Sequence, residues 1–313
     1  MIKKTLYFGN PTYLSLRNEQ LVIKVAEISN SKSIPDEAKK SLEITKPIED
    51  LGYVVLDNKQ ITITSSALNA LLANNCAVIS CNDKGMPSGM FLTIDSNYVQ
   101  SEKFKEQISC SLPLKKQLWQ QTVKAKIENQ TAILKKYTTA ECGCMEEWSE
   151  LVKSGDSDNL EARAAAYYWK NIFYPRIENF NRSRDGEFPN SLLNYGYAIL
   201  RAIVARSLVV SGLLPTLGIH HRNKYNAYCL ADDIMEPYRP YVDEIVIKLI
   251  SNNDKEIDLT KEVKKEFLIL PTIDVHISGQ MSPLMNAVYK TTSSLYKCFN
   301  IEQRKISYPK IIL

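Results

Sequence analysis

The amino-acid sequence predicts an α+β protein with an N-terminal β-sandwich-like domain over residues 1–96 and a larger all-α domain over residues 97–313. Two observations favour this class. Up to about Ile94, the apolar residues alternate with polar ones or come in short runs such as YVVLD and QITITS, which is the period of β-strands. From about Val99 onward, they recur at three- and four-residue spacing, which is typical of amphipathic helices. With 313 residues, of which 44% are hydrophobic, the chain is long enough for two such domains.

The first domain is predicted from further short apolar runs, TLYFG, LVIKV, CAVISC and MFLTI, which are separated by Gly, Pro, Asn and Asp. One segment, Ser65–Asn75, has alanine and leucine at helical spacing and predicts a short helix capped by Ser65 or Ser66. The charged, proline-bounded segment Ser31–Pro47 predicts a mobile loop between two strand pairs, and no chemical role is visible in it.

The second domain is predicted as a series of helices without a repeat of fixed period. Residues 101–136 contain eight lysines and three glutamates, so one face of this region is expected to be cationic, although a solvated helix surface is the simpler explanation. Capping residues and prolines mark several of the helix ends. The predicted helices cover residues 101–136, 157–175, 189–212, 227–250 (bent near Pro237 and Pro240) and a last segment that starts at Ser282–Pro283.

Composition narrows the class of protein further. The N-terminal MIKKTLYFGNP has no apolar run long enough for a signal peptide, and no run of about eighteen uncharged apolar residues occurs, so we expect a cytoplasmic protein without membrane contact. The seven cysteines are odd in number and scattered, which fits reduced thiols better than a disulfide framework. A net charge of +4 is too small by itself to indicate a nucleic-acid-binding protein.

The strongest candidate for a chemical site is the segment GIHHRNKYNAYCLADDIMEPYRP. It contains two adjacent histidines, His220 and His221, and three acids further along, Asp232, Asp233 and Glu236. If the acidic part is helical, either aspartate shares a face with Glu236 and the pair can address one ion. Carboxylates suit Mg²⁺ or Mn²⁺, and Mn²⁺ also accepts imidazole. The two histidines point in different directions on any regular backbone, so only one is expected to bind the same metal.

Spacing alone leaves structural explanations open. The residues DDIME equally fit a solvated acidic turn, and the histidine pair equally fits packing or hydrogen bonding. Glu161 stands in the first turn of a predicted helix, where the helix dipole favours an acid without any catalytic role. Cys142 and Cys144 lack a second cysteine pair at zinc-site spacing. No GxxxxGK(S/T), GxSxG or HExxH motif occurs, which argues against an NTPase, an α/β hydrolase and a zincin metalloprotease.

Over nearly its whole length, the sequence resembles the CRISPR-associated protein one family, the integrases that insert new spacers. PIEDLGYVVLDNKQITIT and CAVISCNDKGMPSGMFL are similar to the family's N-terminal β-domain. NLEARAAAYYW is similar to the segment with its first metal-ligand glutamate, and GIHHRNKYNAYCLADDIMEPYRP to the segment with the remaining ligands. FPNSLLNYGYAIL is similar to the family's central helix and LYKCFNIEQRKISYP to its closing segment. The segment Ser31–Pro47 and the pair Cys142 and Cys144 match no part of the family that we can place.

The resemblance implies the residues of a metal centre. Carried over by position, Glu161, His221 and Glu236 match the three catalytic ligands of one Mg²⁺ or Mn²⁺. Asp233 matches an aspartate that assists through a water or a contact with a ligand. His221 is chosen over His220 because its separation from Glu236 is that of the family. A neutral imidazole in this set implies that activity falls on acidification, because a proton then competes with the metal for His221.

The resemblance also implies an activity, transesterification, in which the 3′-hydroxyl of spacer-precursor DNA attacks a phosphodiester of the CRISPR repeat. It implies homodimers, with the N-terminal domain in dimerisation and partner contacts, bridged by a small ferredoxin-like second CRISPR adaptation protein. The style of GIHHRNKYNA is most similar to members encoded beside a single-protein CRISPR effector nuclease. Basic residues close in sequence to the proposed ligands are expected to contact DNA phosphates; they are Arg182, Arg184, Arg222, Lys224 and Arg239.

Two other functions remain open from the sequence. A metal-dependent nuclease would use the same residues to hydrolyse branched or single-stranded DNA with water as the nucleophile, and residue spacing does not separate it from an integrase. A DNA-binding scaffold without catalysis would carry the acids and histidines for structural reasons. Replacement of the three ligands distinguishes the scaffold from both enzymes, because only an enzyme loses an activity while its fold and DNA binding persist.

Overall fold

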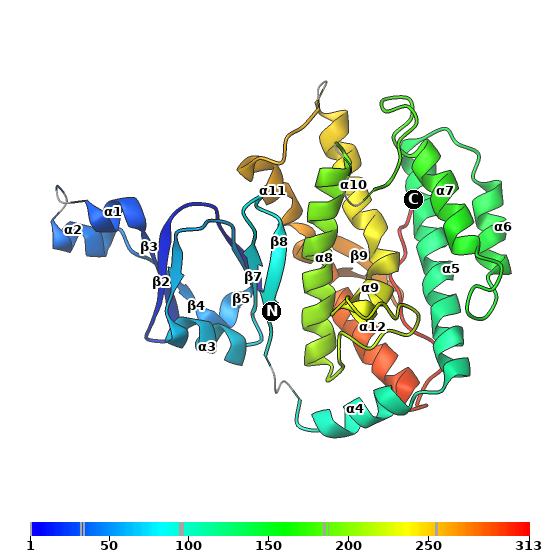
Figure 1. Cartoon of the computed structure of the whole chain (residues 1–313), viewed down its shortest axis with the longest axis horizontal. Helices are drawn as coiled ribbons and strands as arrows, with labels where there is room; N and C mark the ends of the chain where they lie inside the picture. Colours follow the sequence, from blue (N-terminus) through cyan, green and yellow to red (C-terminus); the bar gives the residue numbers. More distant parts are fainter. Residues whose placement is uncertain are drawn as a thin grey trace. The chain divides into compact units, whose positions relative to one another are not determined.

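The fold was analysed in a computed structural model, and it confirms the α+β class, with β-sheets in the N-terminal part and helices in most of the rest (Figure 1). The chain divides into two compact units, Met1–Ser96 and Asn97–Leu313. Each unit has its own core and is described by itself. The structure describes residues 2–31, 33, 35–93, 97–183, 186, 188–253 and 256–313.

Unit 1 contains two four-stranded sheets. In the first sheet, three strands run parallel and the last is antiparallel to its neighbour. The apolar run LGYVVL makes the inner strand β5, which is buried from Leu51 to Val55. The strand order is β1 (Lys4–Phe8), β5 (Leu51–Leu56), β7 (Ala77–Cys81) and β8 (Pro87–Phe91).

The second sheet of unit 1 is built around a hairpin of β2 and β3, which pair antiparallel from Thr12 to Arg17. Helix α3 (Ser65–Ala73) follows its last strand and is capped by Thr64, whose hydroxyl accepts the backbone N–H of Ala67. The predicted cap at Ser65 or Ser66 is therefore wrong by one or two residues, because these serines already have helical backbone. The strand order is β4 (Ile44–Pro47), β3 (Gln20–Val25), β2 (Thr12–Arg17) and β6 (Ile61–Ile63).

The core of unit 1 is formed by residues from both sheets and from α3. The alternation that predicted the strands supplies these side chains, because every second residue of a strand faces the same side. A short 3-10 turn, η1 (Ile48–Asp50), adds its first residue to this core. The core residues are Phe8, Leu14, Leu21, Ile23, Ile48, Leu51, Val54, Ala67, Leu71, Cys76 and Val78.

The segment Ser31–Pro47 departs from the prediction, which is wrong for its described residues. It contains helix α2 (Asp36–Ser41), which follows Pro35, and strand β4, which pairs antiparallel with β3. A further short helix, α1 (Ala26–Asn30), precedes it. The Glu43 carboxylate lies 2.7 Å from Lys24 Nζ and 2.9 Å from an Arg17 guanidinium nitrogen. These ion pairs explain why a strongly charged segment is tied to the sheet.

Unit 2 is organised around two long helices, α5 (Leu112–Tyr137) and α8 (Asn190–Val210). Helix α8 packs against α9, α10 and α12, whereas α5 packs against α6 and α7 (Figure 1). By length and composition α8 alone, among the helices of the described residues, is able to cross a membrane. About two thirds of its apolar window is buried inside the unit, as expected of a core helix. The preceding helices are α4 (Gln100–Ser109), α6 (Gly143–Leu151) and α7 (Leu160–Asn171).

The predicted bend near Pro237 and Pro240 is confirmed. Helix α9 (Cys229–Met235) ends where Pro237 removes a backbone donor, and the chain passes through the 3-10 turn η2 (Glu236–Tyr238) into α10 (Arg239–Ser251). A hairpin that the sequence did not predict precedes the last helix. His276 of this hairpin forms an isolated antiparallel β-bridge with Lys310. The remaining elements are α11 (Lys261–Phe267), η3 (Leu270–Thr272), β9 (Asp274–Ile277), β10 (Gln280–Pro283) and α12 (Leu284–Phe299).

Candidate metal centre

Two of the three proposed ligands, Glu161 and Glu236, meet at a single ammonium group in the helical unit. The Nζ atom of Lys126 lies 2.7 Å from Oε1 of Glu161 and 2.7 Å from Oε2 of Glu236. Lys126 comes from the middle of α5, Glu161 from the first turn of α7, and Glu236 from the turn η2. Carboxylates 75 positions apart in the sequence are therefore brought within reach of one cation.

The start of α7 fixes the backbone of Glu161. Asn159 adopts a left-handed conformation with φ of 52° before the helix begins. The carboxylate of Asp156 then accepts the backbone N–H groups of Leu160 at 2.9 Å and of Glu161 at 3.0 Å. A helix start satisfied in this way holds the first-turn acid in one place, because the free N–H groups have found an acceptor.

Glu236 is held from its other side by Arg239. A guanidinium nitrogen of Arg239 lies 2.9 Å from Oε1 of Glu236, in the next turn of the chain. Burial by itself would raise the pKa of Glu236, but the charges of Arg239 and Lys126 outweigh burial and hold the pKa below its usual value. The carboxylate is 4% exposed and ionised, so it depends on these two cations.

His221 is held by Asp233, which lies on α9. Its Nδ1 atom is 2.5 Å from Oδ1 of Asp233, and this hydrogen bond holds the pKa of His221 above its usual value. The same carboxylate accepts the backbone N–H groups of His220 at 2.9 Å and of His221 at 3.2 Å. Asp233 has no exposed surface, so these three hydrogen-bond donors take the place of water around its carboxylate. The carboxylate therefore fixes both the loop and the imidazole ring.

The two histidines have different neighbours, as their adjacency in the chain requires. The ring of His220 stacks on Trp119, with 4.1 Å between ring centroids and an interplanar angle of 5°. Burial lowers the pKa of His220, so this ring tends to be neutral. His221 meets the same tryptophan edge-on, at 5.7 Å and 83°. The stacked ring is thus the packing histidine, and the ring on Asp233 is the candidate ligand.

The arrangement and the donor atoms of these side chains decide which metal ion the centre suits. Among the residues that the structure describes, no three His, Cys, Asp or Glu side chains surround one point closely enough to hold an ion. Oε2 of Glu236 is buried and accepts no well-aligned hydrogen bond, although Lys126 is 2.7 Å away as an ion-pair partner. A buried carboxylate oxygen with a spare lone pair is a ready ligand for a hard cation. The donors of Glu161, Glu236 and His221 therefore suit Mg²⁺ or Mn²⁺ in their chemistry.

The basic residues predicted to contact DNA fall into two groups. Arg182 donates hydrogen bonds to Asn190 at 2.9 Å and to Asn194 at 2.7 Å, and Arg239 pairs with Glu236, so both side chains have partners inside the unit. Arg222 and Lys224 are exposed. Arg184 lies outside the described residues.

Arg222 and Lys224 line a depression of about 400 Å³ next to the candidate ligand. Its wall also contains Lys115 and His221 itself, so three cationic side chains and the imidazole border the same hollow. An anionic phosphate that entered this depression would find cations beside the proposed ligand.

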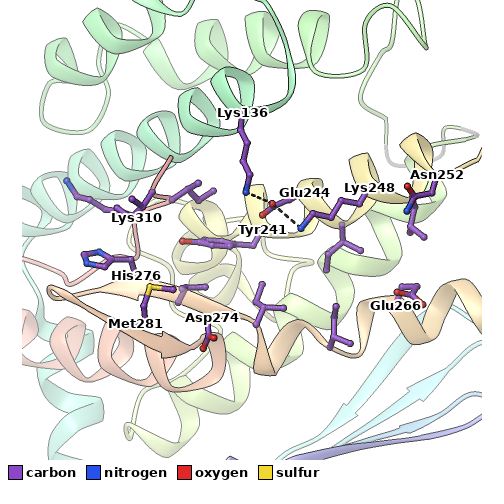
Figure 2. A pocket seen from close by; sticks show the side chains of 17 residues that line it. Lys136, Tyr241, Glu244, Lys248, Asn252, Glu266, Asp274, His276, Met281 and Lys310 are labelled. Atoms are coloured by element: carbon purple, nitrogen blue, oxygen red, sulfur yellow. Dashed lines mark hydrogen bonds and ion pairs between the residues drawn. The ribbon is translucent and has the colours of Figure 1, made fainter.

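A separate cavity of about 490 Å³ lies away from the centre, between the end of α5, α10 and the β9–β10 hairpin (Figure 2). Glu244 accepts hydrogen bonds there from Lys136 at 2.8 Å and from the Tyr137 hydroxyl at 2.6 Å. Lys136 stands ten residues after Lys126 on the same helix, roughly 15 Å along its axis. None of the proposed ligands lines this cavity.

Lys126 is the residue of the candidate centre that the sequence analysis missed. It was counted among the eight lysines of a solvated helix surface, but only 9% of it is exposed. A signal was present in the sequence, because Lys126 shares a helical face with Val123, Gln130 and Trp119, which are three, four and seven residues away. A lysine inside an apolar stripe needs a buried acid as its partner.

A helical unit with carboxylates, an imidazole and a cation-lined depression has the kinds of side chain that enzymes acting on phosphodiesters use. Comparison with known proteins agrees, since residues 6–268 match the family described as CRISPR associated protein Cas1. The CRISPR-associated endonuclease Cas1 of Neisseria meningitidis serogroup C (strain 8013) is 34% identical over 296 residues, or 94% of this chain and 91% of that protein. The chain belongs to the Cas1 family, the CRISPR-associated DNA endonucleases and integrases.

Solved structures share the fold. A casposase bound to integration product has a TM-score of 0.77 and 19% identity, and the match covers 97% of this chain and 92% of that one. A chain of a Cas6-RT-Cas1–Cas2 complex has a TM-score of 0.73 and 22% identity, over 97% of this chain and 36% of the larger chain. The resemblance drawn from the sequence motifs is therefore confirmed at the level of family and fold.

Proposed function

We propose that this chain is the integrase of CRISPR adaptation and inserts spacer DNA into the repeat array by transesterification. The observation that carries the proposal is the convergence of Glu161 and Glu236 on one cation, the ammonium group of Lys126. The casposase with the same fold was solved with an integration product, which supports strand joining as the reaction of this architecture. The 3′-hydroxyl of one DNA end attacks a phosphodiester of the repeat, so that one ester bond forms as another breaks.

Glu161, Glu236 and His221 would hold the ion, Mg²⁺ or Mn²⁺. When bound, such an ion supplies Lewis acidity at a phosphoryl oxygen and lowers the pKa of the attacking hydroxyl. The chain's own contribution is position and charge. Asp233 holds the imidazole of His221 by Nδ1 and leaves Nε2 as the ring nitrogen for coordination. Arg239 keeps Glu236 ionised, because it pairs with the oxygen that Lys126 does not contact.

DNA binding is proposed for the exposed cations, in particular Arg222 and Lys224 beside His221. Their charges would neutralise backbone phosphates and bring a phosphodiester next to the ligands. Arg182 and Arg239 are proposed to support DNA binding from inside the unit, since the side chain of each already has partners there.

The proposed assembly follows the family. We propose a homodimer that uses the N-terminal unit for dimerisation and partner contacts, with a small ferredoxin-like second adaptation protein as the bridge between dimers. The structure of a Cas6-RT-Cas1–Cas2 complex supports such a partner for this fold. A single-protein CRISPR effector nuclease is a further proposed partner, and the cytoplasm is the proposed site of action.

A hydrolytic endonuclease is the second candidate, because the Neisseria relative is named an endonuclease. The deciding assay supplies supercoiled plasmid with a repeat array, short duplexes with free 3′-hydroxyls, and Mn²⁺ or Mg²⁺. Joined products support the integrase, whereas cleavage without joining supports the nuclease and contradicts our proposal.

The ligand assignment is tested in the same assay. Glu161→Ala, His221→Ala and Glu236→Ala are each expected to abolish joining while DNA binding persists. The two glutamate variants are also expected to melt at a lower temperature than wild type, because each leaves Lys126 with one ion-pair partner fewer. Glu146→Ala is the matched control, because Glu146 is an exposed acid that pairs with Lys135 on the surface. Wild-type joining by all three ligand variants would show that the assignment is wrong.

A further inference from the structure

Lys126 occupies the position between the two carboxylates that the proposed function assigns to a metal ion. Its Nζ atom is 2.7 Å from an oxygen of Glu161 and 2.7 Å from an oxygen of Glu236. Side-chain exposure is 11% for the lysine and 5% for Glu236, so water screens this contact poorly. The two acids would face each other as like charges if the ammonium were absent.

The lysine stays charged in this place. Its ammonium group has two counterions in contact, one oxygen of each carboxylate at 2.7 Å, and opposite charges at this distance favour the charged form of the lysine. An uncompensated buried charge is strongly destabilising, whether it belongs to the lysine or to an acid. Lysine and carboxylates therefore stabilise one another, and neither side is easily removed alone.

We propose that Lys126 is a positioning residue, a built-in cation that holds Glu161 and Glu236 together in the metal-free protein and competes with a divalent ion for the same oxygens. The inference rests on the proposed role of the two acids as ligands. Arrival of the ion must break both ion pairs of the lysine, because a divalent cation and an ammonium repel each other at this separation. The measured metal affinity is then a net affinity, weakened by the cost of displacing Lys126.

The lysine also stabilises the metal-free protein. Without it, the two carboxylates would repel each other, and the melting temperature of the metal-free protein would fall. Lys126 thus lowers metal affinity and raises stability, and the two effects are separable by experiment.

Other lysines of α5 serve as controls, because their partners are on the surface. Lys124 lies 2.7 Å from Glu150, with 38% and 71% of the two side chains exposed. Lys124→Met removes one charge from the same helix without touching the centre. Lys126→Met removes the charge and keeps the length of the stem, and Lys126→Gln keeps a hydrogen-bond donor without the charge.

The experiment measures Mn²⁺ affinity by isothermal titration calorimetry and the melting temperature without and with Mn²⁺, on the full chain. For Lys126→Met and Lys126→Gln we expect Mn²⁺ to bind at least about tenfold more tightly than to wild type. We also expect a lower melting temperature without metal and a larger rise when Mn²⁺ is added. Lys124→Met should match wild type in both measurements.

Equal or weaker Mn²⁺ binding in a folded Lys126 variant would overturn the inference, because a purely structural lysine cannot hold metal affinity down. If neither variant folds, the wild-type side-chain ¹⁵N resonances of lysine decide. An ion-paired ammonium signal must be lost on titration with Mg²⁺, and its persistence at saturating Mg²⁺ refutes competition. None of these readouts uses strand transfer, so failure of the integration assay would leave the inference standing.

Discussion

The imidazole Nδ1 of His221 lies 2.5 Å from the buried carboxylate of Asp233, which also accepts the backbone N–H groups of His220 and His221. One acid thus fixes the loop, the ring orientation and the tautomer of the candidate ligand. A histidine held by Nδ1 presents Nε2 for coordination, and an acidic partner raises its basicity as a ligand. Asp233 therefore controls the centre without having to touch an ion.

Asp233→Asn is expected to weaken Mn²⁺ binding about tenfold to a hundredfold, the usual cost of removing the partner of a ligand histidine. The pKa of His221 should also fall, because the hydrogen bond to this carboxylate is the main cause of its elevation. Calorimetry with Mn²⁺ and histidine NMR titration measure the two effects. Asp232→Asn is the control, since Asp232 pairs with Arg201 and Asn226 instead. Unchanged affinity in Asp233→Asn would contradict this role.

Gly218 is expected to tolerate no side chain, because the His221 loop approaches it closely. A Cβ atom there would press on the backbone oxygen of His221 and lie 2.8 Å from Oδ2 of Asp233. We expect Gly218→Ala to lower the free energy of unfolding by about 1–3 kcal/mol and to reduce strand transfer at least about tenfold. Urea unfolding and the joining assay measure these changes.

The control for Gly218 is Gly143→Ala, because nothing lies within 4 Å of a Cβ atom at that position. Gly143 begins helix α6, where alanine is a better helix former than glycine. Its stability is expected to stay the same or rise slightly. If both alanine variants behave alike, the close approach at Gly218 does not matter.

The buried acid Asp243 predicts a pH dependence of stability. Burial is the main cause that raises the pKa of Asp243 from 3.8 to about 6, against hydrogen bonds from the hydroxyls of Tyr197 at 2.5 Å and Tyr168 at 2.9 Å. Arg239 and Arg182 act in the same direction as these hydroxyls. The folded protein therefore binds this proton more tightly than the unfolded chain does.

The direction in which stability changes with pH follows from this difference in proton affinity between the folded and unfolded states. The stabilisation is fully present below pH 3.8, the unfolded value, and is lost as the pH rises through about 6. Relative to Asp243→Asn, which cannot ionise, wild type should lose at most about 3 kcal/mol between about pH 4 and pH 7. Urea unfolding of both proteins across this range measures it, with exposed Asp258→Asn as control. A constant difference between wild type and Asp243→Asn would refute the prediction.

Arg222 and Lys224 are expected to contribute to DNA affinity through charge alone. The double variant Arg222→Ala/Lys224→Ala should weaken binding to all DNA sequences similarly and reduce the salt dependence of log K by about 2. Fluorescence anisotropy over a salt series measures this slope. Arg304→Ala/Lys305→Ala removes the same charge from another exposed segment. Equal losses in both double variants would mean that net charge, not the depression beside His221, attracts the DNA.

The fold class was predictable because the change in hydrophobic period occurs once along the chain. The short apolar run of β5 and the helical spacing of α8 are local properties, and each is set by which side chains must be buried. The hairpin of β9 and β10 was missed because each strand is only four residues long, although Val275 and Ile277 of β9 alternate with polar residues. The Ser31–Pro47 prediction failed because the ion pairs of Glu43 are long-range contacts that composition does not reveal.

The candidate site was predictable only in part. Spacing identified one candidate segment but left either histidine of His220–His221 and either aspartate of Asp232–Asp233 open. The choice of His221 and Asp233 came from the family resemblance, as did Glu161, since an acid in the first turn of a helix has a structural explanation. Neither residue spacing nor the family resemblance identified Lys126, because a count of lysines treats every ammonium group as solvated. The burial of one lysine depends on which helix packs over it, and that is a tertiary property.

Every side chain of the centre belongs to the unit Asn97–Leu313, while Met1–Ser96 has a separate core and contributes none. Substitutions in the two units are therefore subject to different constraints. The surface of the N-terminal unit can change to fit new binding partners as long as its core stays packed. The helical unit is more constrained, because its residues must keep the geometry of the candidate metal centre. A lineage of such proteins would be expected to change its associates more readily than its chemistry.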